Sequence, residues 1–265
     1  MYSIRNFFDN DDVRVIDAKG PFQVIEYRRD LSVTPWDAQI AYFCDQMNVR
    51  KKQVVCDLSK ANITLQAGAM QWMVGDVAAT TGIKGAGDLF SKAVRSKVTG
   101  ESAIKPEYKG TGTLVLEPTY KYILLLDVSE WGGSVVLDDG LFLACDAKLK
   151  HKAVARSNFS SAVAGGEGLF NLGIKGDGVV CLESQCPREE LIEVTLENDV
   201  LKVDGNFAIA WSGSLDFTVE RSGKSLLGSA ASGEGLVNVY RGTGKVLLAP
   251  VGGDAVRPTT ALEEI

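Results

Sequence analysis

The sequence predicts an all-β protein, a double-stranded β-helix-like sandwich or barrel built from three pseudo-equivalent repeats of about 66 residues, with one short N-terminal helix. Three observations lead to this prediction. Two glycine-centred markers recur at a nearly constant period, and strand-length runs of Val, Leu, Ile and Phe flank them. Near the N-terminus, a capping sequence precedes apolar residues at helical spacing.

The first marker is a Gly-Glu pair followed by a Gly-x-Gly turn and an apolar strand. The first glycines of the three turns are evenly spaced, with Gly176 midway between Gly110 and Gly242. The paired glutamates recur at almost the same interval, so two independent markers give one period. We expect Gly110, Gly176 and Gly242 to occupy equivalent strand corners. The full set is Glu101, Glu167 and Glu234 with Gly110, Gly112, Gly176, Gly178, Gly242 and Gly244.

The second marker is an Asp-Gly or Gly-Asn turn inside apolar runs, at Asp138-Asp139-Gly140 and at Asp204-Gly205-Asn206. The offset from Gly140 to Gly205 is almost the same period, and a weaker counterpart lies at Gly68 in the first unit. These dipeptides readily adopt positive φ, which predicts tight hairpin turns.

The repeats define the domain organisation. No unit of this size covers its own apolar face, so we expect the three units to fold as one cooperative body. The predicted parts are an N-terminal extension over 1–53, with strands near Val13–Ile16 and Phe22–Tyr27 and a helix over 35–48; a triplicated β-repeat domain over 54–251; and a loose C-terminal tail over 252–265.

The helix prediction depends on Thr34-Pro35-Trp36-Asp37, where Thr can serve as N-cap, Pro as the first helical residue and Asp as the reciprocal capping acid. Trp36, Ile40, Phe43 and Met47 then follow at helical spacing.

Two continuous apolar runs, Tyr122–Leu126 and Leu141–Cys145, indicate strands that are buried on both faces. Alternation within one chain does not easily cover both faces. The sequence therefore predicts a homo-oligomer in which part of this surface meets another subunit, with the helix around Trp36–Met47 as an alternative cover.

Composition excludes several classes. The chain has 265 residues, 45% hydrophobic and 23% charged, which excludes a disordered, collagenous or coiled-coil protein. A net charge of −6 argues against nucleic-acid binding, which requires clustered positive charge. The single histidine, His151, leaves little basis for a catalytic or His-rich metal centre, and its lysine neighbours predict that it is exposed and idle.

The five cysteines include no C-x-x-C pair and are expected to be reduced thiols. Acidic residues at Asp9–Asp12 occupy the place where a secretory signal would be apolar. No apolar run reaches the ~18 residues of a transmembrane helix. These features predict a cytoplasmic protein without a transmembrane segment.

The repeated Gly-Glu-Gly-Leu and Gly-x-Gly elements, together with Gln66–Trp72, resemble the altered inheritance of mitochondria protein 24 family, formerly a domain of unknown function. The resemblance spans about residues 54–250. It implies an all-β, double-stranded β-helix-like fold similar to that of the tryptophan RNA-binding attenuation protein. It implies no established reaction, and the inner-membrane role of the mitochondrial member transfers poorly to a chain without a transit peptide.

The equivalent carboxylates Glu101, Glu167 and Glu234 allow two interpretations. A ring of carboxylates near a repeat axis could hold Ca²⁺ or Mg²⁺. Alternatively, each glutamate accepts hydrogen bonds from the backbone of a neighbouring glycine turn and has a structural role. We favour the structural interpretation and assign no catalytic, cofactor or metal residue.

Other motifs carry weaker signals. Gly82–Gly87, ahead of Asp88, has the glycine content of a phosphate loop without its order, and we interpret it as a connector. Arg28-Arg29 and Arg50-Lys51-Lys52 are interpreted as solvated strand ends rather than RNA contacts.

The leading functional hypothesis is a non-enzymatic β-repeat scaffold or assembly factor that acts through self-association and protein contacts. The alternative is a small-molecule or metal-binding module that uses the barrel interior or the repeat axis.

Overall fold

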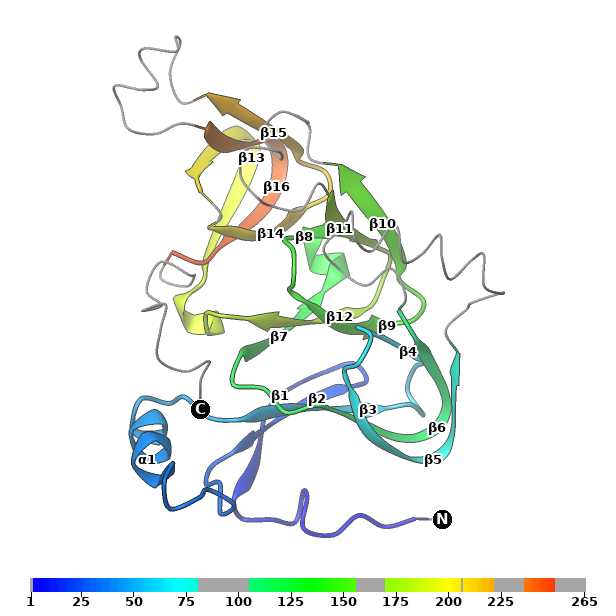
Figure 1. Ribbon diagram of the computed structural model, residues 1–265. Helices are drawn as coiled ribbons and strands as arrows, with labels where there is room; N and C mark the ends of the chain where they lie inside the picture. The colour runs from blue at the N-terminus through cyan, green and yellow to red at the C-terminus, as the bar shows by residue number, and fades with distance from the viewer. Residues whose placement is uncertain (1, 81–104, 156–169, 206, 222–235, 251–265) are drawn as a thin grey trace, which may run out of the picture.

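The computed structural model describes residues 2–80, 105–155, 170–205, 207–221 and 236–250, and it confirms an all-β fold with one α-helix among these residues (Figure 1). Every strand pair is antiparallel. The first sheet has the order β1 (Val13–Lys19), β2 (Phe22–Tyr27), β3 (Lys52–Asp57), β6 (Glu107–Leu116), β4 (Ile63–Leu65), β9 (Phe142–Asp146), β12 (Val179–Ser184) and β7 (Tyr122–Asp127), with β5 (Met70–Thr80) beside β6. The second has the order β10 (Lys150–Ala155), β11 (Phe170–Lys175), β8 (Ser134–Leu137), β14 (Ala208–Ser212), β16 (Leu236–Leu248) and β13 (Ile192–Asp204), with β15 (Asp216–Arg221) beside β16.

The first sheet curls until β7 lies near β1 and β3, which nearly closes it into a barrel, and the second forms a half-barrel (Figure 1). Strands β7, β9 and β12 form the wall between the two. Leu124 and Leu126 of β7 pack into the core shared with the second sheet. Ile123 and Leu125 of the same strand pack into the interior of the first. The wall is therefore packed on both faces.

This wall explains the two continuous apolar runs. Residues 123–126 and 141–145 are all buried, as predicted. However, strands of the same chain cover both faces, so these runs need neither a second subunit nor the N-terminal helix as a lid. The expectation that these runs need an external cover was wrong, because the chain packs a core on each side of the shared wall. The homo-oligomer itself stays a prediction.

The turns at the second glycine marker connect strands that do not pair with each other, so they are sheet corners rather than hairpin turns. Gly68, Gly140 and Gly205 do have positive φ, at 85°, 75° and 62°. Yet the turn at Gly140 leads from β8 in the second sheet to β9 in the first, and the strands β13 and β14 that flank Gly205 each pair with β16. The hairpin prediction was wrong because the turn redirects the chain to partners that are distant in sequence.

The Gly-x-Gly elements lie where strands change partners, but only that at Gly176 is a turn between strands. The turns predicted at Gly110 and Gly242 were wrong, because these glycines lie within β6 and β16. Gly110, Gly176 and Gly242 have φ of 125°, 135° and 118°, a region that L side chains rarely adopt. Before Gly110, β6 pairs with β4, and after it with β3. At Gly176 the chain leaves β11 in the second sheet and enters β12 in the first. Beyond Gly242, β16 gains β14 as a neighbour in place of β15.

The N-terminal residues are part of the first sheet. The strands expected near Val13–Ile16 and Phe22–Tyr27 are present as β1 and β2, and β2 pairs with β3. Phe22 and Val24 belong to the barrel core. The boundary that we placed between residues 53 and 54 thus falls within β3.

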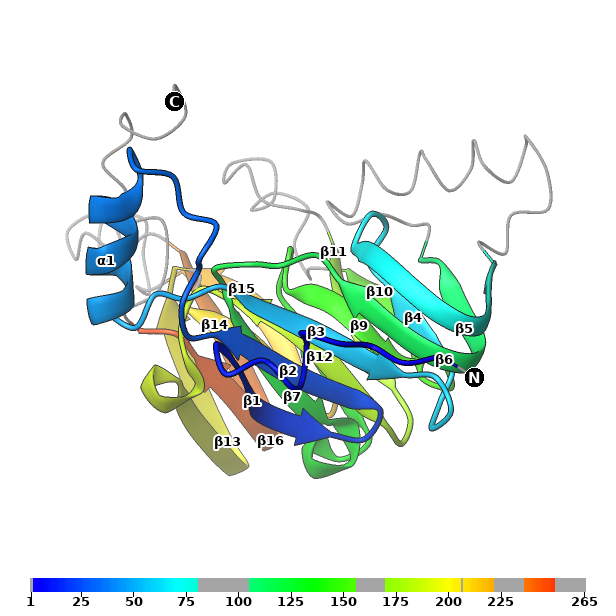
Figure 2. The same ribbon diagram turned by 90° about the horizontal axis from the view of Figure 1, so that it is seen from below.

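The helix is shorter than predicted. Helix α1 spans Ala38–Gln46, not 35–48, and its N-cap is Asp37. Thr34 and Asp37 do bond reciprocally, at 2.5 Å between Oγ1 and Oδ2 and 3.3 Å between the Asp37 N–H and Oγ1, but they close a turn ahead of the helix. No residue of α1 is buried, and the helix stands at one end of the molecule, apart from the sheets (Figures 1 and 2).

Candidate functional site

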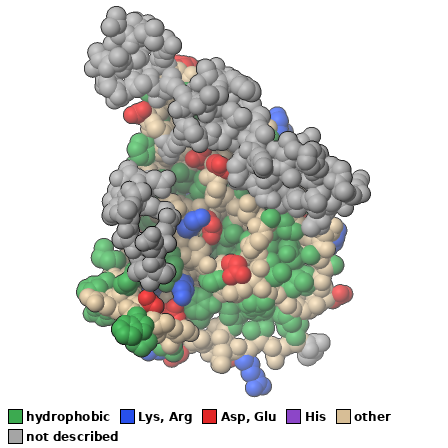
Figure 3. Space-filling model, in the orientation of Figure 1, with side chains coloured by type: hydrophobic (Ala, Val, Ile, Leu, Met, Phe, Trp, Pro, Cys, Tyr) green, Lys and Arg blue, Asp and Glu red, His purple; other side chains and the backbone are tan. Residues whose placement is uncertain are grey.

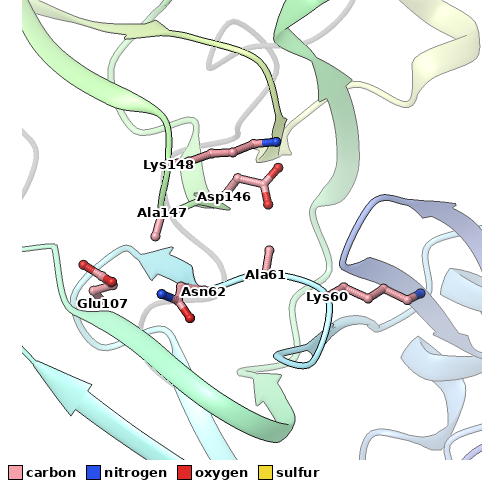
Figure 4. Close-up of a pocket in the computed structure, with 7 residues that line it drawn as sticks. All are labelled: Lys60, Ala61, Asn62, Glu107, Asp146, Ala147 and Lys148. Atoms are coloured by element: carbon pink, nitrogen blue, oxygen red, sulfur yellow. The ribbon is translucent and has the colours of Figure 1, made fainter.

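A cavity of about 410 Å³ opens at the end of β9 (Figure 4). Asp146 is the last residue of β9, and Ala147 and Lys148 follow it in the turn toward β10. The loop before β4 supplies the facing wall, because the Ala147 N–H donates to the Asn62 carbonyl at 2.9 Å. The lining residues are Lys60, Ala61, Asn62, Glu107, Asp146, Ala147 and Lys148.

Asp146 is the buried polar residue of this cavity. It is 4% exposed, and its Oδ2 accepts the backbone N–H of Val179 at 2.7 Å. Gly178 leaves room for this contact, since a Cβ there would lie 2.6 Å from Oδ2 and 2.9 Å from Cε of Lys148. Burial raises the pKa of Asp146, and the nearby charges of Asp177 and Asp127 raise it further. The hydrogen bond from Val179 and the charge of Lys148 lower the pKa but do not cancel the rise.

A related contact occurs one repeat period further along the chain. Ser212, at the end of β14, accepts the backbone N–H of Lys245 through Oγ at 3.0 Å. Both hydrogen bonds span 33 residues, and both acceptors also bind a following backbone N–H through their carbonyl oxygens, of Leu149 at 3.1 Å and Leu215 at 3.1 Å. Each acceptor bonds the residue that comes directly after a Gly-x-Gly element. We call these two hydrogen bonds the corner braces.

The predicted site residues divide into two groups. Glu101, Glu167 and Glu234 lie outside the described residues, as do Gly82–Gly87 and the tail over 252–265. The corner glycines are described: three have positive φ, and the other three face close neighbours. Those three are Gly112, Gly178 and Gly244. A Cβ added at each would lie within 3 Å of Val74, Asp146 and Ser212, respectively.

Sequence reasoning missed Asp146, Lys148 and Ser212. A carboxylate that braces a glycine turn was expected, but it was assigned to glutamates upstream of the turn. The available signal was that Asp146 and Ser212 end strands that are separated by one full repeat period.

His151 is not the exposed residue that the sequence predicted. Its Nε2 lies 3.1 Å from Sγ of buried Cys145, and its ring meets Phe142 edge-on at 5.5 Å. Burial lowers the pKa of His151 to about 4 and raises the pKa of the Cys145 thiol. Both side chains are therefore neutral at pH 7, the reverse of a thiolate–imidazolium nucleophile.

Three residues of the basic pairs, Arg29, Arg50 and Lys51, form ion pairs with carboxylates. Arg29 pairs with Asp12, Lys51 with Asp30 at 2.5 Å, and Arg50 with Asp45 at 2.5 Å. Lys52 is 3% exposed and lies 4.0 Å from Glu26, so it is a buried residue rather than a solvated strand end. These charges leave no uncompensated basic stripe for a phosphate backbone among the residues that the structure describes.

Within the described ranges, no three His, Cys, Asp or Glu residues are grouped so that they could hold a metal ion. In the same ranges, no helix combines the length and apolar character needed to span a membrane.

Comparisons with known proteins place this architecture. The chain is 31% identical over 195 residues to an uncharacterized protein of Streptococcus pyogenes serotype M6, covering 71% of this chain and 76% of that one. A crystal structure of a Streptococcus pyogenes protein matches with a TM-score of 0.56 and 27% identity, covering 77% of this chain and 89% of the other. The mitochondrial biogenesis AIM24 family matches residues 46–251. Because the family model covers most of the chain and the Streptococcus pyogenes relative is 31% identical, the chain belongs to the mitochondrial biogenesis AIM24 family.

Proposed function

We propose that this chain is a non-enzymatic scaffold or assembly factor that acts through self-association and protein contacts. Its contact surface is the α1 face, which we define as Trp36, Ile40, Phe43 and Met47. The exposure of this face is the observation that carries the proposal.

The α1 face consists of large apolar side chains, as expected of a helix that packs against another surface. Trp36 is 92% exposed, Met47 75%, Phe43 56% and Ile40 54%. At ~150–250 Å² for a large side chain, the face leaves on the order of 500 Å² of apolar surface in water. That equals the largest apolar patch of a typical monomer, which is often functional. Figure 3 shows hydrophobic side chains gathered over α1.

A second copy of the chain fits this face better than a lipid surface does. Helices that lie on membranes are usually rich in Lys and Arg, whereas Asp45 is the only charged residue between Ala38 and Gln46. The chain also carries a net charge of −6, which disfavours anionic lipid. Two apolar α1 faces meet without like-charge repulsion, since Asp45 is paired with Arg50 at 2.5 Å.

The helix is held in a defined place. Arg50 contacts Asp45 of α1 at 2.5 Å and Glu26 of β2 at 3.6 Å, so a single guanidinium connects the helix to the barrel. A groove of about 710 Å³ separates α1 from the body. Arg50 therefore restricts where α1 lies relative to the barrel, which lowers the cost of ordering the α1 face in an interface.

The non-enzymatic part of the proposal is supported by the state of Cys145 and His151. Their pKa values move away from neutrality in opposite directions, so at pH 7 Cys145 is not a thiolate nucleophile and His151 is only a weak base. None of the five cysteines, all of them in the described ranges, forms a disulfide, which supports our proposal of a reducing, cytoplasmic location.

Light scattering after size exclusion tests the proposal. The wild-type chain should elute above 28.4 kDa at micromolar concentration. A Trp36→Ser/Phe43→Ser variant should return to the monomer mass without loss of folding.

A matched control is Ile192→Ser/Val200→Ser, which removes apolar side chains that are 50% and 46% exposed on β13. This control should leave the mass unchanged. A monomeric wild type, or an equal loss of assembly in both variants, would contradict the proposal.

A further inference from the structure

We propose that the cavity at the end of β9 binds a small zwitterion of the α-amino acid class, with its ammonium group on Asp146 and its carboxylate on Lys148. This binding function is independent of the proposed self-association, because the α1 face contributes no residue to the cavity.

The first support is the incomplete satisfaction of a buried carboxylate. Asp146 is 4% exposed, and the one hydrogen bond of its side chain among the described residues is that from the Val179 N–H to Oδ2. An ionised carboxylate accepts about four hydrogen bonds, and burial without them is costly. Oδ1 accepts no hydrogen bond from the described residues, and Asp146 lines the cavity, so a ligand can supply the missing donor; a positively charged donor gives the strongest hydrogen bond.

The second support is the position of Lys148. It follows Asp146 closely in the same turn, lies on the same side of the cavity (Figure 4), and its Cε packs where a Cβ of Gly178 would stand. Within the described residues, no carboxylate forms an ion pair with Lys148 within 4.0 Å. A carboxylate carried by a ligand can supply that partner.

The other charged residues of the lining are already paired. Lys60 lies 3.9 Å from Asp57, and Glu107 lies 3.7 Å from Lys109. Figure 4 places Glu107 and Asn62 across the cavity from Asp146, so the two carboxylates do not converge on one ion. The charges that remain for a ligand are one negative and one positive, side by side.

The volume of the cavity and the arrangement of its charged groups narrow the class of ligand. Ligand cavities commonly measure ~300–1,000 Å³, and this one measures about 410 Å³. In an α-amino acid a single carbon separates the ammonium and carboxylate groups, which matches two binding groups on neighbouring turn residues. Asn62 on the opposite wall offers an amide to the ligand side chain.

Thermal unfolding of the full chain tests the proposal. The proteinogenic α-amino acids are added singly at millimolar concentration, beside methylamine and acetate as single-charge controls. At least one amino acid should raise the midpoint temperature of unfolding, whereas methylamine and acetate should not. Calorimetric titration of that amino acid should then show one binding site.

Two variants locate the site. Asp146→Asn keeps an acceptor for the Val179 N–H and removes the charge, and Lys148→Met removes the cation from an exposed position. Each should weaken binding at least tenfold. Ser212→Ala is the control, because it breaks the other corner brace without touching the cavity. If Asp146→Asn fails to fold, Lys148→Met decides alone.

Three results would overturn the proposal: no amino acid binds, methylamine or acetate binds equally well, or binding survives in both variants. None of these results bears on the oligomeric state, so failure here is distinguishable from failure of the assembly proposal.

Discussion

Asp146 and Val179 are joined by a hydrogen bond of 2.7 Å between a side-chain oxygen and a backbone N–H, and Ser212 and Lys245 repeat this relationship one period later at 3.0 Å. In each case the donor directly follows a Gly-x-Gly element. The backbone at a sheet corner loses ladder partners, and a side-chain acceptor replaces one of them. The corner braces are therefore a structural device that is used at two corners of this fold.

The braces should differ in strength. Ser212→Ala removes a neutral acceptor and should lower the free energy of unfolding by about 1 kcal/mol. Asp146→Ala removes a buried acceptor that bonds a backbone N–H and should cost about 2 kcal/mol. Urea unfolding at pH 7 measures both values. A larger loss for Ser212→Ala than for Asp146→Ala would contradict this ranking.

The corner glycines should show a graded response to alanine. At all three positions the positive φ penalises an L residue by about 1–3 kcal/mol. At Gly110 a Cβ would also lie 2.0 Å from the Asp76 carbonyl oxygen, at Gly176 it meets Leu149 at 3.1 Å, and at Gly242 its nearest neighbour is at 3.8 Å. Stability should therefore fall most for Gly110→Ala and least for Gly242→Ala. Equal losses would show that φ alone sets the cost.

His151 should titrate far below an ordinary imidazole. The chain has one histidine, so its NMR signals need no assignment. We expect a native pKa of about 4 against about 6.5 in urea, because burial disfavours the charged ring. A titration near 6.5 in the native state would contradict the buried Cys145 contact.

The same shift has a consequence for acid stability. The native pKa is depressed, so the unfolded chain takes up the proton first as the pH falls. The free energy of unfolding is unaffected by His151 above pH 6.5, where the ring is neutral in both states. Between pH 6.5 and about pH 4 it falls by at most about 3 kcal/mol, because the unfolded chain is protonated first. His151→Phe should flatten this part of the curve of stability against pH.

Thiol chemistry should separate the five cysteines. Cys44 on α1 is partly exposed, and Cys56, Cys145, Cys181 and Cys186 are buried. An aromatic disulfide reagent should label Cys44 rapidly in the native protein and the other four only after unfolding. Fast labelling of Cys145 would show that its thiol is more accessible than the structure indicates.

Much of the fold could be predicted from the sequence, because glycine spacing and apolar runs are local signals. The strands β1 and β2 and the positive φ at Gly140 and Gly205 are examples. Strand pairing was harder, since it depends on contacts between distant segments. The turn at Gly140 is a good turn signal, yet sequence does not reveal that the strands on its two sides enter different sheets.

The candidate site was less accessible to sequence reasoning. Asp146 ends an apolar strand as many solvated residues do, and only its tertiary surroundings make it buried. The helix shows the opposite case: an apolar stripe predicts a buried face, but no part of this chain among the described residues buries it. A stripe reports a preference for burial without identifying the partner.

Hydrogen exchange of α1 tests the assembly proposal most directly. A nine-residue helix without packing is marginal in water, so its amides should exchange fast when the chain is dilute. If the α1 face meets a second copy, protection over Ala38–Gln46 should rise with concentration while that of β7 stays constant, and Trp36→Ser/Phe43→Ser should abolish the rise. Exchange over α1 that is the same at every concentration in a chain shown to associate would contradict the account.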